Sequence, residues 1–337
     1  MHIWVLPVSG GSFPKQLGLI TALLELGLKP DVVLAASGGN VAAYAAAAAD
    51  WEADGIDRVS RCLDTDLFLS SWWPNPLDIL PSWLIGFFRG SIYKQGCGGV
   101  ELFHTLFSPR TIARTEIWTG TTNMVDGKAH LFCNRCRDDS LIDLSHFNPT
   151  QAGCASAEHL NGDVTMIAKA TIASASIPTL VPGQAVAETP LYDGGVLFAS
   201  PLTPLQDAIT HSAKGELHID YVSSFDMESD QVSFESYTMM QIGTMTFAEL
   251  VRSLCRQDRL AAIELIKRCG SKVHYTTGVA ADLPSFQEMR RSSHYSLLEI
   301  YPLYKEEPLD LAHFSGEQVV ALSHKVQGQY GLRLWWA

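Results

Sequence analysis

Ser37 is the first residue in the chain whose surroundings suggest catalytic chemistry. It follows the short apolar segment 31–36 and precedes Gly38, Gly39 and an alanine-rich stretch at 41–49. A strand that turns sharply into a helix holds a serine hydroxyl exposed and beside the positive end of the helix. Small residues are needed on both sides because such a turn is tight. The segment therefore predicts a nucleophilic serine at position 37.

The same serine also has a purely structural interpretation. A serine that precedes an alanine-rich helix often caps it, with the side-chain oxygen accepting a hydrogen bond from a backbone N–H of the first turn. The local pattern is Ala35-x-Ser37-x-Gly39, one methyl group away from G-x-S-x-G. Taken alone, this pattern leaves both roles open.

Two other segments carry residues suited to acyl transfer. An apolar strand is predicted at 3–8 and a helix at 14–26, and Gly10 and Gly11 lie between them. Backbone N–H groups in such a glycine loop can point at an anion, although the loop also fits a simple tight turn. Far downstream, an apolar stretch ends in Asp193, followed by two glycines. This segment is either a turn or a carboxylate whose bare backbone lets another group approach.

Together, the three segments resemble the patatin-like phospholipase family. Its members carry a glycine-rich oxyanion loop after the first strand, then a G-x-S-x-G elbow, and a D-G-G or D-G-A motif far downstream. The segment 173–178, Ala-Ser-Ala-Ser-Ile-Pro, is similar to the small-residue segment that the family has ahead of its acid. The order and distances of the segments also fit, and the resemblance extends from the N-terminus to Pro204.

The resemblance implies an α/β fold, with a mostly parallel sheet and helices on both faces in a three-layer sandwich. It also implies a lipid acyl hydrolase of the phospholipase A or lysophospholipase type that needs no cofactor. Asp193 would accept the proton of Ser37 directly, and backbone N–H groups of Gly10 and Gly11 would hold the oxyanion. Four further glycines would support the elbow and the acid loop: Gly38, Gly39, Gly194 and Gly195.

The chain departs from the family pattern at two places. Ala35 stands where the elbow motif begins with glycine, and the oxyanion loop lacks the third glycine and the basic residue of the family. Ser12 falls near the basic position, and Lys15 is the nearest cation. A second hypothesis is therefore a catalytically inactive binding protein on the same fold. Retention of both Ser37 and Asp193 argues against it.

A third hypothesis is an esterase with a Ser-His-Asp triad. In α/β-hydrolases the chain order is serine, acid, histidine. Histidines that follow Asp193 in this order include His211, His218 and His274. A glycine loop that opens the chain, combined with Asp-Gly-Gly, is not the form that the oxyanion and acid elements take in that fold, so the dyad is the favoured interpretation.

Composition restricts the expected partners. The formal net charge is −12 and no Lys/Arg cluster is present, which argues against nucleic-acid binding and against electrostatic docking on anionic lipid. The family resemblance implies phospholipid or another acyl lipid as the partner, and the charge implies that any transient contact with a membrane surface would be apolar. With 47% hydrophobic residues, the chain can bury a sizeable core.

Targeting and metal-binding signals are also absent from the sequence. Met1 leads directly into the first strand without a signal peptide, and no apolar run reaches the roughly 18 residues that span a bilayer. Seven scattered cysteines fit reduced thiols. The pair Cys133 and Cys136 lacks a second pair at ligand spacing, so no metal site is expected. We expect a cytoplasmic protein that contacts membranes only peripherally.

The order of predicted elements indicates one domain over residues 1–337. Strands are predicted at 116–124 and 129–133, joined by an Asp-Gly turn, and at 217–222 in the centre of the sheet. Helices are predicted at 164–174, 247–267 and 316–328, and a last strand at 272–275. Segment 70–99 mixes tryptophan and proline, which fits either an apolar cap or lid over the site or a second layer packed on the core.

Overall fold

The computed structural model describes the following residues: 1–9, 13–25, 27–62, 100–101, 103–104, 114–150, 152–178, 181–186, 188–214, 217–223 and 239–269. Several predictions lie outside them. These are the oxyanion residues Gly10 and Gly11, the cap segment 70–99, the strand at 272–275 and the helix at 316–328.

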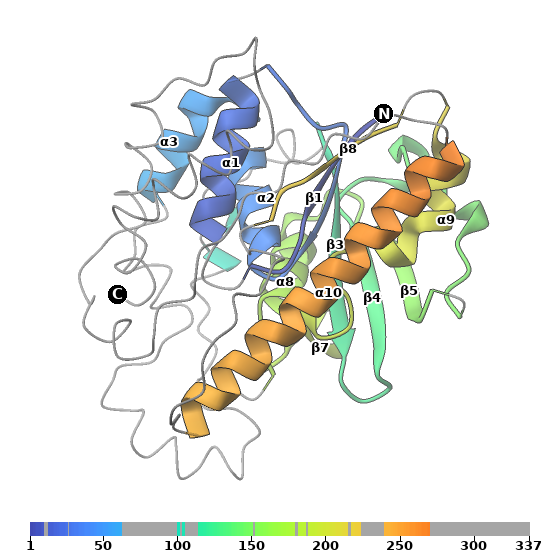
Figure 1. The fold of residues 1–337 in the computed structure, drawn as a ribbon. Helices are drawn as coiled ribbons and strands as arrows, with labels where there is room; N and C mark the ends of the chain where they lie inside the picture. The colour runs from blue at the N-terminus through green and yellow to red at the C-terminus, as the bar shows by residue number, and fades with distance from the viewer. Residues whose placement is uncertain are drawn as a thin grey trace.

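A mostly parallel sheet forms the centre of the described chain (Figure 1), as the sequence predicted. Its main strands are β1 (His2–Leu6), β2 (Val32–Ala36), β3 (Glu116–Asn123), β4 (Lys128–Cys133), β5 (Cys154–His159) and β8 (His218–Tyr221), in the order β5-β4-β3-β2-β1-β8. Only β3 and β4 are antiparallel neighbours along this path. Strand β8, predicted at the centre, lies at the end of this order.

Two shorter strands lie off this path and join the sheet through β3. Strands β6 (Gln184–Val186) and β7 (Thr189–Asp193) form an antiparallel pair. Strand β2 pairs with the first part of β3, as far as Gly120, and β7 pairs antiparallel with the next residues of β3. The end of β7 therefore arrives directly beyond the end of β2.

Helices cover both faces of the sheet (Figure 1). Helices α1 (Phe13–Glu25), α2 (Gly38–Ala48), α3 (Ala53–Cys62) and α8 (Val164–Ser174) share one buried cluster, and α9 (Leu202–Ser212) and α10 (Met239–Cys269) contribute to another. Strand β1 shows why both faces need cover. Its residues Trp4 and Leu6 belong to the first cluster, whereas Ile3 and Val5 belong to the second.

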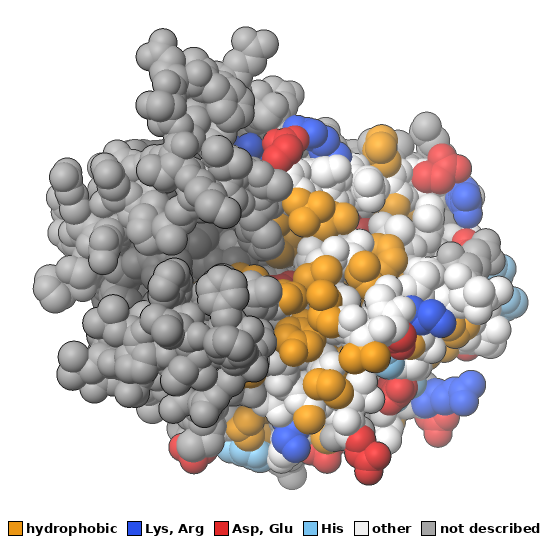
Figure 2. Space-filling view, turned by 90° about the horizontal axis from the view of Figure 1, so that it is seen from below, with side chains coloured by type: hydrophobic (Ala, Val, Ile, Leu, Met, Phe, Trp, Pro, Cys, Tyr) orange, Lys and Arg blue, Asp and Glu red, His pale blue; other side chains and the backbone are white. Residues whose placement is uncertain are grey.

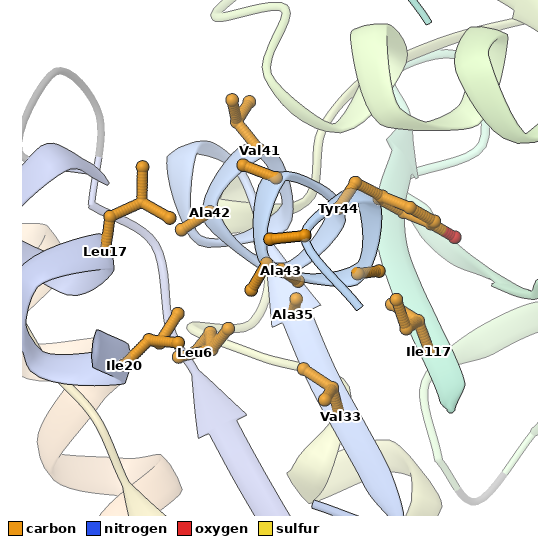
Figure 3. Packing of buried hydrophobic residues seen from close by; sticks show 14 of the residues in the cluster. Leu6, Leu17, Ile20, Val33, Ala35, Val41, Ala42, Ala43, Tyr44 and Ile117 are labelled. Atoms are coloured by element: carbon orange, nitrogen blue, oxygen red, sulfur yellow. The ribbon is translucent and has the colours of Figure 1, made fainter. Parts of the chain in front are cut away.

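Helix α2 lies close to the sheet because its residues are small. Alanines of α2 fill the space above Leu6 of β1 and Ala35 of β2, with Ile20 of α1 beside them (Figure 3). At the start of the helix, a Cβ on Gly39 would lie 2.6 Å from the Pro7 carbonyl oxygen and closer still to that of Leu6. Only glycine allows this approach, which fixes where the helix begins.

The helix boundaries test the sequence predictions closely. Helix α8 spans the predicted residues 164–174, and α10 extends beyond the predicted 247–267 at both ends.

Within the described part of the chain, no helix combines the length and hydrophobicity needed to cross a bilayer.

The close approach of α2 to β1 predicts that Gly39→Ala lowers the free energy of unfolding by roughly 3 kcal/mol, because the new methyl group meets two backbone carbonyls that cannot turn away. Thermal and urea denaturation measure the effect. Gly120→Ala is the matched control, since a Cβ there meets only ordinary contacts at 3.5 Å and beyond. Equal stability of the two variants would contradict the close approach.

Candidate active site

Ser37 is the single residue between the last residue of β2 and the first of α2. Its φ of 56° and ψ of −134° lie outside the conformations that a serine prefers, so the turn holds strained backbone. The Ser37 side chain makes no capping hydrogen bond to the helix. The capping interpretation is therefore wrong, and the hydroxyl is directed elsewhere.

The Ser37 hydroxyl instead donates a hydrogen bond to Asp193. The distance between Ser37 Oγ and Asp193 Oδ2 is 2.8 Å, across 156 positions of sequence. The other carboxylate oxygen, Oδ1, accepts a hydrogen bond of 2.7 Å from the backbone N–H of Gly195. The fold thus brings together the two residues that the sequence singled out.

The register of β3 explains this meeting. Ala36 of β2 pairs with Gly120 of β3, and Asp193 of β7 pairs with the next residue, Thr121. Ser37, which comes directly after Ala36, and Asp193 therefore lie beside the same part of β3. A Cβ on Gly194 would lie 2.6 Å from the Gly120 carbonyl carbon, so the residue after the acid has to be glycine for β7 to come this close.

Ser174, at the end of α8, fixes the backbone of the turn. Its hydroxyl donates to the Gly120 carbonyl at 2.6 Å and accepts from the backbone N–H of Ser37 at 2.9 Å. Nearby, the Ser176 carbonyl accepts a 2.9 Å hydrogen bond from the N–H of Asp193. Sequence reasoning placed both serines in a family-like segment without assigning them a role. The sequence carried no signal for this bridge, because a Cβ would fit at Gly120 and the contact depends on strand register.

Burial makes Asp193 a stronger base than an ordinary carboxylate. The residue is 3% exposed, and this desolvation raises the pKa of Asp193 to about 7, although the hydrogen bonds from Ser37 and Gly195 oppose the shift. A general base works best when its pKa lies near the working pH. The site therefore holds a carboxylate suited to taking a proton from a hydroxyl near neutral pH.

Ser37 is only 2% exposed, so the prediction of an exposed hydroxyl is wrong. The residue is enclosed between β2, α2 and the acid loop, and it keeps its place at the N-terminus of α2.

Strand β1 leads from the sheet to the side of the acid loop. The Val8 N–H donates to the Ala199 carbonyl at 2.8 Å, and a Cβ on Gly195 would lie 2.7 Å from a methyl group of Val8. Ser9, the next residue, is fully buried and its Oγ has no hydrogen-bond partner. The last residues described after β1 therefore lie against the loop that follows Asp193.

Histidines are not part of this arrangement in the described residues. The hydrogen bonds to the Asp193 carboxylate come from Ser37 and Gly195. His211 stacks on His146 with ring centroids 3.9 Å apart. His218 pairs with His2 at the start of the parallel strands, the end away from Ser37. His274 lies outside the described residues.

Helix α10 secures the chain just after the acid loop. Its buried Asp258 accepts hydrogen bonds from the hydroxyls of Ser200 and Thr203, the latter at 2.7 Å. Desolvation raises the pKa of Asp258 to about 7, as it does for Asp193. The described residues contain no group of three or more His, Cys, Asp or Glu side chains that could hold a metal ion.

Comparison with known proteins identifies the family. The model of the patatin-like phospholipase family matches residues 10–205, which is more than half of the chain. The chain belongs to the patatin-like phospholipase family. A search of the curated proteins found no match. The matched segment includes the Ser37 turn and the Asp193 loop, and the family assigns the protein in general terms to the lipid acyl hydrolases.

The substitution Asp193→Asn should make the protein more stable above neutral pH. The unfolded carboxyl has a pKa of 3.8 and the folded one about 7, so the stabilising contribution of its protonation is complete below pH 3.8 and is lost as the pH rises through 7. An amide carries no charge to bury, so the variant should gain a few kcal/mol at alkaline pH and little in acid. Thermal melting across this pH range measures the difference.

Asp258 provides the comparison for this measurement. It has the same direction of shift, so the Asp193→Asn variant should retain part of the pH dependence and lose it when Asp258→Asn is added. A variant at position 193 that melts below the wild type at alkaline pH would contradict the burial argument.

Proposed function

We propose that the protein hydrolyses fatty-acyl esters of lipids through an acyl-enzyme on Ser37, with Asp193 as the base. The observation that carries the proposal is the hydrogen bond from Ser37 Oγ to Asp193 Oδ2. Serine is a weak nucleophile unless an adjacent base accepts its proton. Membership of the patatin-like phospholipase family supports a lipid substrate, and we expect a phospholipase A or lysophospholipase activity.

The proposed reaction has two halves. Ser37 Oγ attacks the ester carbonyl carbon while its proton moves to Asp193, and the leaving alcohol takes that proton as the C–O bond breaks. Water then attacks the acyl-enzyme and gives a proton to Asp193. The bond to Ser37 breaks, the serine regains its proton from Asp193, and the fatty acid leaves.

Stabilisation of the oxyanion is assigned to the loop after β1. The N–H groups of Gly10 and Gly11 are the proposed donors, and one such donor typically contributes about 3 kcal/mol to lowering the barrier. The route of the chain into this loop, beside Gly195, supports the assignment. The N-terminus of α2 adds positive potential at the same point.

The inactive-protein hypothesis remains the alternative to test. Loss of the family's basic residue from the oxyanion loop favours it, whereas the raised pKa of Asp193 and its contact with Ser37 favour catalysis. If this part of the chain served only the fold, it would not need a buried carboxylate in contact with a serine whose backbone is strained.

A fluorophosphonate probe should label the wild type at Ser37, and lipid profiling should show release of fatty acid. Ser37→Ala should lose the label and at least 100-fold of the activity, because the nucleophile is absent. Mass spectrometry of the labelled peptide locates the probe. Equal fatty-acid release by wild type and Ser37→Ala would refute the proposal.

Variants of the base and of the histidines separate dyad from triad. Asp193→Asn should lose labelling to a similar extent. His130→Ala is the sharpest control, because His130 pairs with Thr121, the residue opposite Asp193, yet hydrogen-bonds to Ser156 through its Nδ1. His130→Ala, His211→Ala and His218→Ala should all retain activity, and loss of activity in one of them would favour a triad.

The activity should rise with pH and level off above about pH 7, since Asp193 acts only as the carboxylate. Below this pH, kcat/KM for a soluble ester should fall about tenfold for each pH unit. Carboxyl ionisation depends little on temperature, whereas imidazole ionisation depends on it strongly. An inflection that shifts markedly on warming would point to a histidine base instead.

A further inference from the structure

The site and the hairpin between β3 and β4 lie at the same edge of the sheet, the one at which the parallel strands β1, β2 and β3 end. Gly120 of β3 lies level with the last residue of β2, and Met124 follows four residues later, roughly 13 Å further along the strand direction. The hairpin between β3 and β4, residues 124–127, is the lowest part of that strand pair in Figure 1. We call these four residues the hairpin tip.

The hairpin tip presents two apolar side chains in a fixed conformation, beside the exposed Asp126. Val125 is 87% exposed and Met124 is 48% exposed. The turn is held by hydrogen bonds from the Val125 N–H to Asn123 Oδ1 and from the Gly127 N–H to the Asn123 carbonyl. Ordered turns usually carry polar residues, so two apolar side chains held out in solvent mark a contact surface.

The segment around the acid extends this apolar surface. Residues 177–192 run from α8 through β6 and β7 to Asp193, and their one charged residue is Glu188. Among the described residues of this segment, the apolar and aromatic ones that remain at least partly exposed are Ile177, Pro178, Val181, Pro182, Ala185, Pro190 and Tyr192. Figure 2 looks at the molecule from this side, and hydrophobic side chains gather over the middle of its described part, with charged ones mainly towards the rim.

We propose that the hairpin tip and segment 177–192 together form a docking face for a lipid surface without net charge. The inference rests on the proposed function, because the face includes β7, which ends at Asp193 and pairs with β3 just before the hairpin tip. A net charge of −12 opposes anionic membranes, whereas apolar side chains can enter the boundary between headgroups and acyl chains of any bilayer.

A second copy of this chain fits the face less well than a lipid surface. A stable protein interface buries about 800 Å² on each partner in a well-packed patch. The hairpin tip holds only two exposed large apolar side chains, which is little for such a patch, whereas even a small apolar contact can enter a fluid layer.

The test uses the full chain with Ser37→Ala, so that vesicles stay intact, and measures co-sedimentation with phosphatidylcholine vesicles. This protein should bind, and adding Val125→Asp should weaken binding roughly tenfold, since the apolar contact is replaced by a charge. Met124→Ser should weaken it less. Leu260→Asp is the matched control, because Leu260 is 65% exposed in the part of α10 that leads away from this edge, and it should bind as before.

Several results would overturn the docking face. These are unchanged binding of the Val125→Asp protein, equal loss with Leu260→Asp, or binding that requires phosphatidylserine. A dimer in solution that Val125→Asp converts to a monomer would assign the face to a second copy instead. Melting temperatures of all variants show whether each is folded.

Hydrolysis distinguishes failure of the docking face from failure of the proposed function. With Ser37 restored, Val125→Asp should lower the ratio of vesicle hydrolysis to soluble-ester hydrolysis about tenfold. A protein that hydrolyses neither substrate refutes the proposed function, while the sedimentation result still decides whether the face binds lipid.

Discussion

The carbonyl group of Gly120 is the point at which the segments that build the site meet. It accepts the Ser174 hydroxyl, and it packs so tightly against Gly194 that no side chain fits there. The neighbouring strand residue, Ala36, leads directly into Ser37. Because the three segments come from distant parts of the chain, a shift of this carbonyl would move the serine and the acid apart.

The site combines two unfavourable features that the surrounding fold compensates. Ser37 adopts a strained backbone conformation, and Asp193 is buried with few partners. Both are stable only because the central strands and α2 are fully packed around them. Strained backbone and buried charge lower the stability of the folded protein, and proteins tolerate them mainly at functional sites. A carboxyl with a raised pKa beside a hydroxyl therefore indicates a candidate active site.

Sequence reasoning predicted the features that depend on local pattern. The strand-to-helix turn at Ser37, the acid followed by glycines and the helix at 164–174 are all encoded by neighbouring residues. It missed the Ser174 bridge, because that contact depends on strand register. It also expected an exposed serine and a central β8, since burial and strand order follow from how distant segments pack and cannot be inferred from periodicity.

The position of β8 and α10 has a consequence for the order of folding. Strand β1 at the start of the chain is completed by β8 more than 200 residues later, and Asp258 holds Ser200 from further on still. Both contacts need residues beyond the segment that carries the serine and the acid. A nascent chain emerging from the ribosome therefore contains Ser37 and Asp193 before these supports can form. The surroundings of Ser37 and Asp193 are therefore completed only after the chain as far as α10 has been synthesised.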